Sequence, residues 1–154
     1  MFSVLVSAFD EFVISDIRVV GLQRVSIGSI FTIIPISVGD RMSEEKVRDI
    51  VLALFDTEQF NDIKISKDGT ALIIDIEERP SISSIELEGN SALKSEDLLR
   101  GLEGAGIAEG QVYKRSTLEG MKSELVRQYA SQGRYGAGVE VETFDKPRNT
   151  IDLR

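Results

Sequence analysis

Hydrophobic and polar residues alternate near the start of the chain and then switch to the period of a helix. Ile17 and Val19 share one face of an expected strand over Ser15–Val20, and Gly21 ends that strand. Four apolar residues then recur at helical spacing: Ile27, Ile30, Phe31 and Ile34. Pro35 stops this helix because proline cannot continue the backbone hydrogen bonds. The pattern therefore predicts a strand followed by a short helix.

A longer helix and a β-hairpin are expected next. Ser43 is the predicted N-cap of the helix, since serine accepts a hydrogen bond from the free N–H groups of the first turn. The apolar stripe of this helix consists of Val47, Ile50, Val51, Leu54 and Phe55. Two alternating stretches begin at Phe60 and Leu72, and Asp68-Gly69 between them is a hairpin signal. The expected order of elements is β-α-α-β-β.

The second half of the chain repeats this pattern. Four positions match at a constant offset of 68 residues: Ile85, Leu87, Gly89 and Leu93 correspond to Ile17, Val19, Gly21 and Val25. Because self-similarity at a fixed spacing indicates a structural repeat, we predict two tandem copies of one unit. Ile151–Leu153 is expected to copy Ile74–Ile76 in the last strand.

The second copy has its own expected helix starts and strand. Ser95 is the predicted cap of a short helix, and Ser116-x-x-Glu119 is the predicted capping box of a longer one. Val139 and Val141 alternate with acidic residues, which predicts a strand there.

These elements predict an α+β fold of two units, each a three-stranded mixed sheet with two helices on one face. We place the first domain at residues 12–80 and the second at 81–154, with its last strand cut short. Residues 1–11 are interpreted as a signal-peptide remnant or a tail, because the apolar start has no basic segment. Arg79, Pro80 and Ser81 are expected to form a restricted hinge.

Amino-acid composition and net charge exclude several classes of function. The chain has 154 residues, of which 42% are hydrophobic and 29% charged, as in globular proteins. Its net charge of -8 argues against a nucleic-acid partner. Cys and His are absent, which removes thiol catalysis, disulfides and the commonest general base near neutral pH. The sequence also lacks a run of about 20 apolar residues, the length of a membrane-spanning helix.

No group of residues forms a convincing catalytic, cofactor or metal site. Gly101, Gly104 and Gly106 follow an expected helix rather than a strand, so they do not match a phosphate loop. The paired acids at 44–45, 77–78 and 96–97 start helices or end a strand, whereas acid–base catalysis needs carboxylates that face each other across a cleft. We therefore expect no enzyme activity, no cofactor and no bound metal.

Sheet edges are the remaining candidate site. An edge strand presents unpaired N–H and C=O groups to which an extended peptide can bind. The candidate residues are Phe60, Ile63, Lys64, Ile65 and Ser66 in the first unit, and Ala137, Gly138, Val139, Glu140, Val141, Glu142 and Thr143 in the second. The alternative, that one or both strands are internal, stays open from the sequence.

Four segments carry a family resemblance: Ile14–Val25, Val38–Ile65, Ile76–Leu98 and Arg148–Arg154. They resemble the POTRA domain, in particular the first two such domains of outer-membrane β-barrel assembly factors. The resemblance implies a periplasmic array ahead of a membrane barrel, in which the first strand of each C-terminal hairpin is the exposed edge. It also implies two kinds of partner, namely unfolded outer-membrane proteins guided by strand addition and accessory lipoproteins.

Two other interpretations remain open. The units are alternatively a purely architectural spacer, or the POTRA region of a related two-partner-secretion or translocation pore. In each case the resemblance implies membrane contact only through a barrel outside this sequence, and no nucleic-acid partner.

Overall fold

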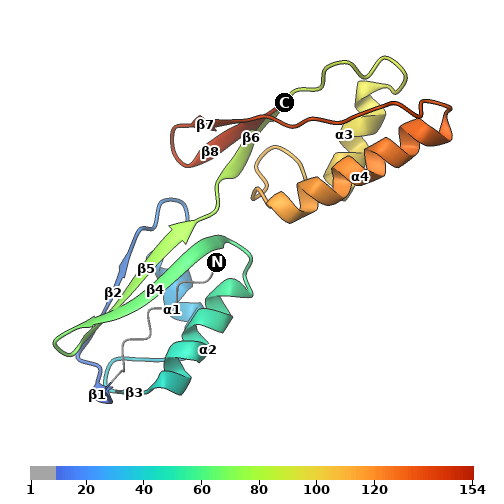
Figure 1. The fold of residues 1–154 in the computed structure, drawn as a ribbon. Coiled ribbons are helices and arrows are strands. Elements are labelled where there is room, and N and C mark those ends of the chain that lie inside the picture. The colour runs from blue at the N-terminus through green and yellow to red at the C-terminus, as the bar shows by residue number, and fades with distance from the viewer. Residues whose placement is uncertain (1–9) are drawn as a thin grey trace. The chain divides into compact units, whose positions relative to one another are not determined.

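The structure, a computed structural model, describes residues 10–154 and divides into two compact units. One unit ends at Glu78 and the other spans Arg79–Arg154. Figure 1 shows that each contains a small sheet with two helices on one face. The interpretation of the N-terminal tail lies outside the described residues, apart from Asp10 and Glu11.

The first unit is built around a mixed three-stranded sheet. Its strands are β2 (Asp16–Val20), β4 (Phe60–Asp68) and β5 (Ala71–Glu78). β5 is central, since β2 pairs with it in parallel and β4 pairs with it antiparallel. Leu72, Ile74 and Ile76 of β5 are buried, whereas Asp75 and Glu77 are exposed. The alternation expected from the sequence therefore holds through this strand.

Two helices cover this sheet: α1 (Ile27–Ile33) and α2 (Glu44–Phe55). Ser43 caps α2 as predicted, because its hydroxyl accepts the Lys46 N–H. The apolar face predicted for α1 is partly wrong. Ile30 and Ile34 are buried, but Ile27 and Phe31 are exposed, because α1 turns only the former positions toward the core.

A second, two-stranded sheet was not expected from the sequence. β1 (Phe12–Val13) pairs antiparallel with β3 (Arg41–Met42). Each strand has only two residues, too few to produce a recognisable alternation. Met42 is nevertheless fully buried and belongs to the core of the first unit.

The second unit has the same topology as the first, which confirms the predicted repeat. Its strands are β6 (Ser81–Ile85), β7 (Thr143–Lys146) and β8 (Thr150–Leu153), and its helices are α3 (Ser95–Gly104) and α4 (Arg115–Ser131). The order is β6-β8-β7, with β6 parallel and β7 antiparallel to β8. The buried core residues are Ile82, Leu102, Ile107, Leu118, Ile151 and Leu153.

Both helix caps predicted in the second unit are wrong. Ser95 is the first residue of α3, and its hydroxyl lies 2.8 Å from the donating Nδ2 of Asn90. Ser116 lies inside α4, which begins one residue earlier. The N-cap positions are Lys94 and Lys114, and neither makes a side-chain capping bond. A side chain from the preceding loop has engaged Ser95, which a local cap pattern does not reveal.

The strand predicted at Val139 and Val141 is also wrong, because β7 begins only at Thr143. Glu142 and Arg154 still exchange two backbone hydrogen bonds, of 2.9 and 3.0 Å. The segment that contains Val139 and Val141 has no residue of β8 opposite it. It therefore makes no ladder hydrogen bonds with β8.

The predicted match of Ile151–Leu153 to Ile74–Ile76 is wrong. Ile17 pairs with Leu72, whereas Ile85, its counterpart in the repeat, pairs with Leu153. Loop lengths differ between the hairpins, so simple sequence offsets do not give the structural correspondence.

Candidate strand-binding edges

β4 is an edge strand of the first unit, with β5 on one side only. Its hairpin loop has two residues, and Gly69 at the first of them has φ +62°, as in a type II′ turn. The closing pair Asp68–Ala71 of such a turn is hydrogen-bonded, and hydrogen-bonded pairs alternate along an antiparallel ladder. The backbone N–H and C=O groups of Ile63, Ile65 and Lys67 therefore point away from β5.

The side chains along β4 partly cover this outward edge. The Ile63 N–H donates to Asp62 Oδ1 at 3.0 Å, which agrees with its outward direction. Lys64 Nζ lies 3.7 Å from Asp62 Oδ2. Lys67 Nζ lies 5.4 Å from the centroid of the Phe12 ring. Charged side chains beside an open edge hinder uncontrolled pairing between chains.

Five predicted site residues of the first unit lie on this edge strand. Phe60 and Ile63 are buried, Ile65 is half-buried, and Lys64 and Ser66 are exposed. Some of these five residues therefore lie in the core and others at the surface. Only Ile63 and Ile65 among them direct their backbone N–H and C=O groups away from β5. Lys67 was not among the predicted site residues, because the direction of its N–H follows from the hairpin register rather than from its residue type.

The second candidate edge is shorter. β7 is an edge strand, and the reciprocal Glu142–Arg154 pair makes Thr143 and Asp145 its outward-facing positions. Of the predicted residues, only Thr143 belongs to the strand. Before the strand come six predicted residues that belong to no helix or strand: Ala137, Gly138, Val139, Glu140, Val141 and Glu142.

The three predicted hinge residues lie in different surroundings. β5 ends at Glu78 and β6 begins at Ser81, so Arg79 and Pro80 stand between the two strands. Ser81 is buried, and its N–H donates to the Asn149 carbonyl at 3.1 Å.

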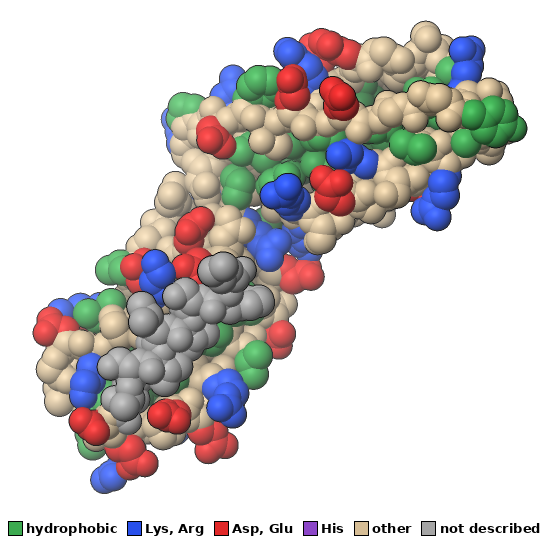
Figure 2. Space-filling view, viewed as in Figure 1, with side chains coloured by type: hydrophobic (Ala, Val, Ile, Leu, Met, Phe, Trp, Pro, Cys, Tyr) green, Lys and Arg blue, Asp and Glu red, His purple; other side chains and the backbone are tan. Residues whose placement is uncertain are grey.

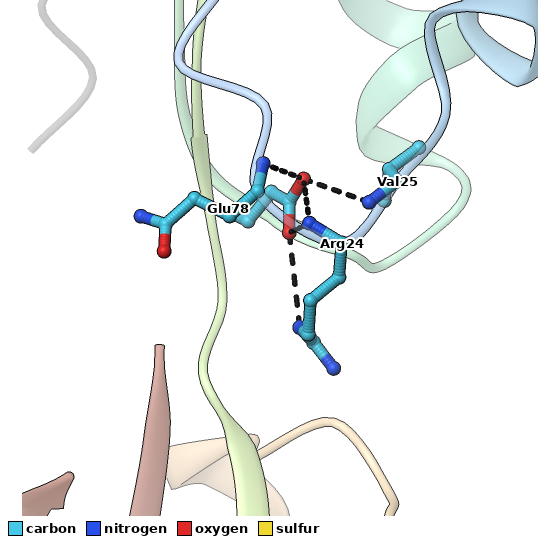
Figure 3. Close-up of polar contacts among 4 residues, drawn as sticks. Arg24, Val25 and Glu78 are labelled. Atoms are coloured by element: carbon cyan, nitrogen blue, oxygen red, sulfur yellow. Dashed lines mark hydrogen bonds and ion pairs between the residues drawn. The ribbon is translucent and has the colours of Figure 1, made fainter. Parts of the chain in front are cut away.

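Glu78 is a buried and hydrogen-bonded acid of the first unit, whereas its place in the sequence indicates only one of two adjacent acids. Its carboxylate accepts hydrogen bonds from the backbone N–H groups of Gln23, Arg24 and Val25, at 2.8 to 3.1 Å (Figure 3). Arg24 Nε lies 3.8 Å from Oε2, and the Glu78 side chain is completely buried. Glu78 therefore holds the loop after β2 against the end of β5.

On the face shown in Figure 2, charge is distributed without a large field of one sign among the described residues. Figure 2 shows basic and acidic side chains interspersed over the visible face. Acidic side chains gather locally around Arg154: Glu86, Glu88 and Glu142 lie 3.2, 3.6 and 3.8 Å from its guanidinium. The Glu86 side chain, followed by the charges of the other two, raises the pKa of Arg154 above its ordinary value.

The described residues contain no cluster of three or more acidic side chains arranged to hold a metal ion. Likewise, no helix among them combines the length and apolarity needed to cross a bilayer.

Comparison with known proteins identifies the class. The POTRA family, described as "Surface antigen variable number repeat", matches residues 80–154. The N-terminal domain of Omp85 from Thermosynechococcus elongatus has the same fold, with a TM-score of 0.59, 15% identity, and coverage of 94% of this chain and 62% of that one. POTRA1-2 of the periplasmic domain of Omp85 from Anabaena gives a TM-score of 0.51, 16% identity and 94% coverage of both chains.

Residues 80–154 therefore match the POTRA family, and both units have the fold of Omp85 POTRA domains. Nearly the whole chain is similar to the outer membrane protein assembly factor BamA. It is 29% identical to BamA of Neisseria meningitidis serogroup B over 146 residues, or 95% of this chain. It spans only 18% of the length of that relative. The predicted fold class and family are thus confirmed.

Proposed function

We propose that this chain is a periplasmic scaffold and binding module for outer-membrane protein assembly. In this proposal β4 binds extended segments of unfolded β-barrel proteins by strand addition. The observation that carries it is the outward row of backbone groups at Ile63, Ile65 and Lys67 on an edge strand. The names of the relatives support the setting, because they describe an assembly factor and a periplasmic domain rather than an enzyme.

Strand addition suits a substrate class that varies in sequence. The main-chain hydrogen bonds of an added strand do not depend on its side chains, so one edge serves many segments. Selectivity then comes from the alternate side chains that face the module. The half-buried Ile65 offers an apolar contact beside the edge, and Lys64 and Lys67 favour segments with acidic residues.

Thr143 and the preceding residues Ala137–Glu142 form a second proposed edge in the other unit. Docking of accessory lipoproteins is a further part of the proposal, and it rests on the family resemblance rather than on a particular surface of this chain.

A peptide titration tests the role of β4. The peptide is a ten-residue outer-membrane strand with alternating apolar and polar residues, followed by ¹⁵N NMR of this chain. We expect shifts at the amides of Ile63, Ile65 and Lys67. The variant Lys67→Pro should weaken binding, because proline removes an outward donor, while Lys67→Ala removes only the side chain and its charge.

Unchanged amides along β4 at saturating peptide would contradict the strand-addition role and favour the architectural spacer. Equal affinities of the proline and alanine variants would show that side-chain contacts, and not backbone donors, bind the peptide. Both variants must retain the wild-type spectrum in the core of the first unit.

We also propose that Arg79, Pro80 and Ser81 act as a restricted hinge. The fixed φ of proline limits the directions in which the chain can leave β5. Replacing Pro80 with glycine should broaden the distribution of distances between spin labels on the two units, measured by pulsed electron resonance. An unchanged distance distribution would show that Pro80 does not restrict the hinge.

A further inference from the structure

The turn between α1 and α2 lies against the chain that leads into β2. We call Ser37–Asp40 the first interhelical turn. A hydrogen bond of 3.1 Å from the Asp40 N–H to the Ser37 carbonyl joins its ends, and Gly39 at its third position has φ +95°. This is the pattern of a type II turn, which favours glycine at that position. The Ile14 N–H donates to the Asp40 carbonyl at 2.9 Å, and the Gly39 N–H donates to the Ile14 carbonyl at 2.8 Å.

The second unit repeats these bonds. Its interhelical turn is Ala108–Gln111, in which Gly110 has the third position and φ +83°. The Ile82 N–H donates to the Gln111 carbonyl at 2.9 Å, and the Gly110 N–H donates to the Ile82 carbonyl at 2.8 Å. The two turns have only the glycine in common in their sequences. Their shared contribution is therefore the pairing of the backbone rather than any side-chain contact.

The hydrogen-bond register shows which groups of β2 face away from the sheet. β4 takes the backbone groups of every second residue of β5, beginning at Ala71, and leaves those of the residues between them to β2. A residue in a parallel ladder bonds the two residues beside its partner. Arg18 is paired with Ile73, so its groups bond the neighbours of Ile73 and point to β5. Ile17 and Val19 therefore direct their N–H and C=O groups away from the sheet.

Among the described residues, this outward edge is closed at both ends. The next outward position toward the N-terminus is Ile14, which is paired with the interhelical turn, and β3 continues the pairing along β1 (Figure 1). Toward the C-terminus, Gly21 turns the chain away with φ +88°, and Glu78 holds the loop that follows. An added strand would therefore pair with only Ile17–Val19, which is the lower limit of strand length.

The corresponding edge of β6 is shorter still. The Glu86 N–H donates to the Leu153 carbonyl at 2.9 Å, so Ile85 before it points outward. The register of β6 shifts between Ile82 and Ser84, directly after the residue that the interhelical turn pairs with. Such irregularities interrupt pairing along a sheet edge. The two units thus close the edge of their first strand at the same place and by the same bonds.

We propose that the interhelical turn of each unit blocks strand addition at the edge of its first strand, so that an extended segment adds only at the hairpin edge. The first sheet then accepts one added strand, next to β4, where no described turn crosses the outward groups of Ile63, Ile65 and Lys67. The block applies to any extended chain, including a second copy of this protein. Its consequence for substrates rests on the proposed function of β4, whereas the block itself does not.

A first edge without its turn has a ready partner in a second copy. If two β2 strands pair antiparallel about Ile17, Asp16 of each copy lies opposite Arg18 of the other. Opposite charges at facing positions stabilise such a pair. The freed N–H and C=O groups of Ile14 also lengthen the edge. We therefore expect removal of the interhelical turn to cause self-association.

Two substitutions at one position test the block. Gly39→Pro removes the N–H that donates to Ile14 and excludes the positive φ, so it displaces the turn. Gly39→Ala keeps the N–H and is the matched control. Sedimentation equilibrium at one protein concentration should give a higher mean mass for the proline variant than for the alanine variant and the wild type. Amide exchange at Ile17 and Val19 should slow by about tenfold or more in the associated proline variant only.

A second variant displaces the turn without proline, by insertion of Gly-Ser-Gly between Val38 and Gly39. The amide resonances of β5 report whether each variant keeps the fold of the first unit. If the proline variant loses them, the insertion variant decides. A folded turn variant that keeps the mass of the wild type would overturn the proposal. Equal association of the alanine variant would also overturn it, because the N–H of residue 39 would then have no part in the block.

The outer-membrane strand peptide separates this inference from the proposed function. At saturating peptide, the wild-type amides of Ile17 and Val19 should not shift, and shifts there would overturn the block. If the peptide shifts no amide of β4 while the turn variants still self-associate, strand addition at β4 is contradicted and the block is supported.

Discussion

Individual residues in the first unit show how local chemistry determines a loop. Gly21 and Glu78 lie far apart in sequence, yet both secure the turn that follows β2. The glycine allows the central strand to pass at van der Waals distance, and the carboxylate satisfies N–H groups that would otherwise be buried without partners.

Replacing Gly21 with alanine should destabilise the first unit strongly. The new Cβ would collide with the Ile76 carbonyl and also oppose the positive φ, so we expect a loss of about 3 kcal/mol in unfolding free energy. Gly39→Ala is the matched control. Its φ is +95° but its surroundings are open, and it should cost about 1 kcal/mol. Urea denaturation measures both values. Equal losses would show that the close approach of Gly21 to the Ile76 carbonyl does not affect the unfolding free energy.

Replacing Glu78 with alanine should cost about 3 kcal/mol, because three backbone N–H groups lose their charged acceptor in a buried place. Glu77→Ala, on the exposed face of the same strand, should change stability by less than about 0.5 kcal/mol. The same urea titration applies. A small effect at Glu78 would mean that water replaces the carboxylate without loss.

At the scale of single elements, the two edge strands differ in how open they are. β4 has nine residues, and its first outward donor is occupied by a neighbouring side chain. β7 has four exposed residues and is preceded by unpaired chain. Edge position alone does not give access, since local side chains compete with an incoming strand for the same N–H groups.

Asp62→Ala should strengthen peptide binding to β4. The substitution frees the Ile63 N–H, so we expect the dissociation constant to fall by about three- to tenfold, the equivalent of one hydrogen bond. Asp68→Ala removes the same charge from the same strand, but the Asp68 N–H points to β5, and the substitution should have little effect. An NMR titration measures both constants. If the two variants bind equally, charge rather than donor release governs the change.

At the scale of the whole molecule, the two units share a topology but not a core of equal size. Fourteen buried hydrophobic residues form the core cluster of the first unit and six form that of the second, among the residues that the structure describes. Since buried apolar area is the main favourable term in folding, the second unit of this 154-residue chain should be the less stable one.

Tyrosine fluorescence separates the two unfolding transitions. The chain has three tyrosines and no tryptophan, and Tyr113, Tyr129 and Tyr135 all lie in the second unit. Fluorescence should therefore report a transition at lower urea than the main change in circular dichroism. Gly21→Ala should lower the second transition and leave the tyrosine midpoint unchanged. Coincident transitions would show instead that the units unfold as one.

The sequence by itself determined the repeat, the order of the main strands and helices, and the hairpin turn at Asp68-Gly69, because these depend on local periodicity and turn chemistry. The family followed from the resemblance of four segments and not from periodicity. The α2 stripe and the β5 alternation are examples, since burial follows residue type there. Its failures have two causes. The strand at Val139 and the mismatch in the last hairpin depend on which distant segment lies opposite, whereas the caps at Ser95 and Ser116 depend on the residue at which each helix begins.

Only the tertiary structure decided which strands are edges and which backbone groups point outward. It also joined Glu78 to the loop after β2 and paired the turn between the helices with the chain at the first strand of each unit. The physical reason is that pairing across a sheet is a relation between segments far apart in the chain. A residue's own side chain does not specify whether its N–H meets a neighbouring strand, a carboxylate or a turn.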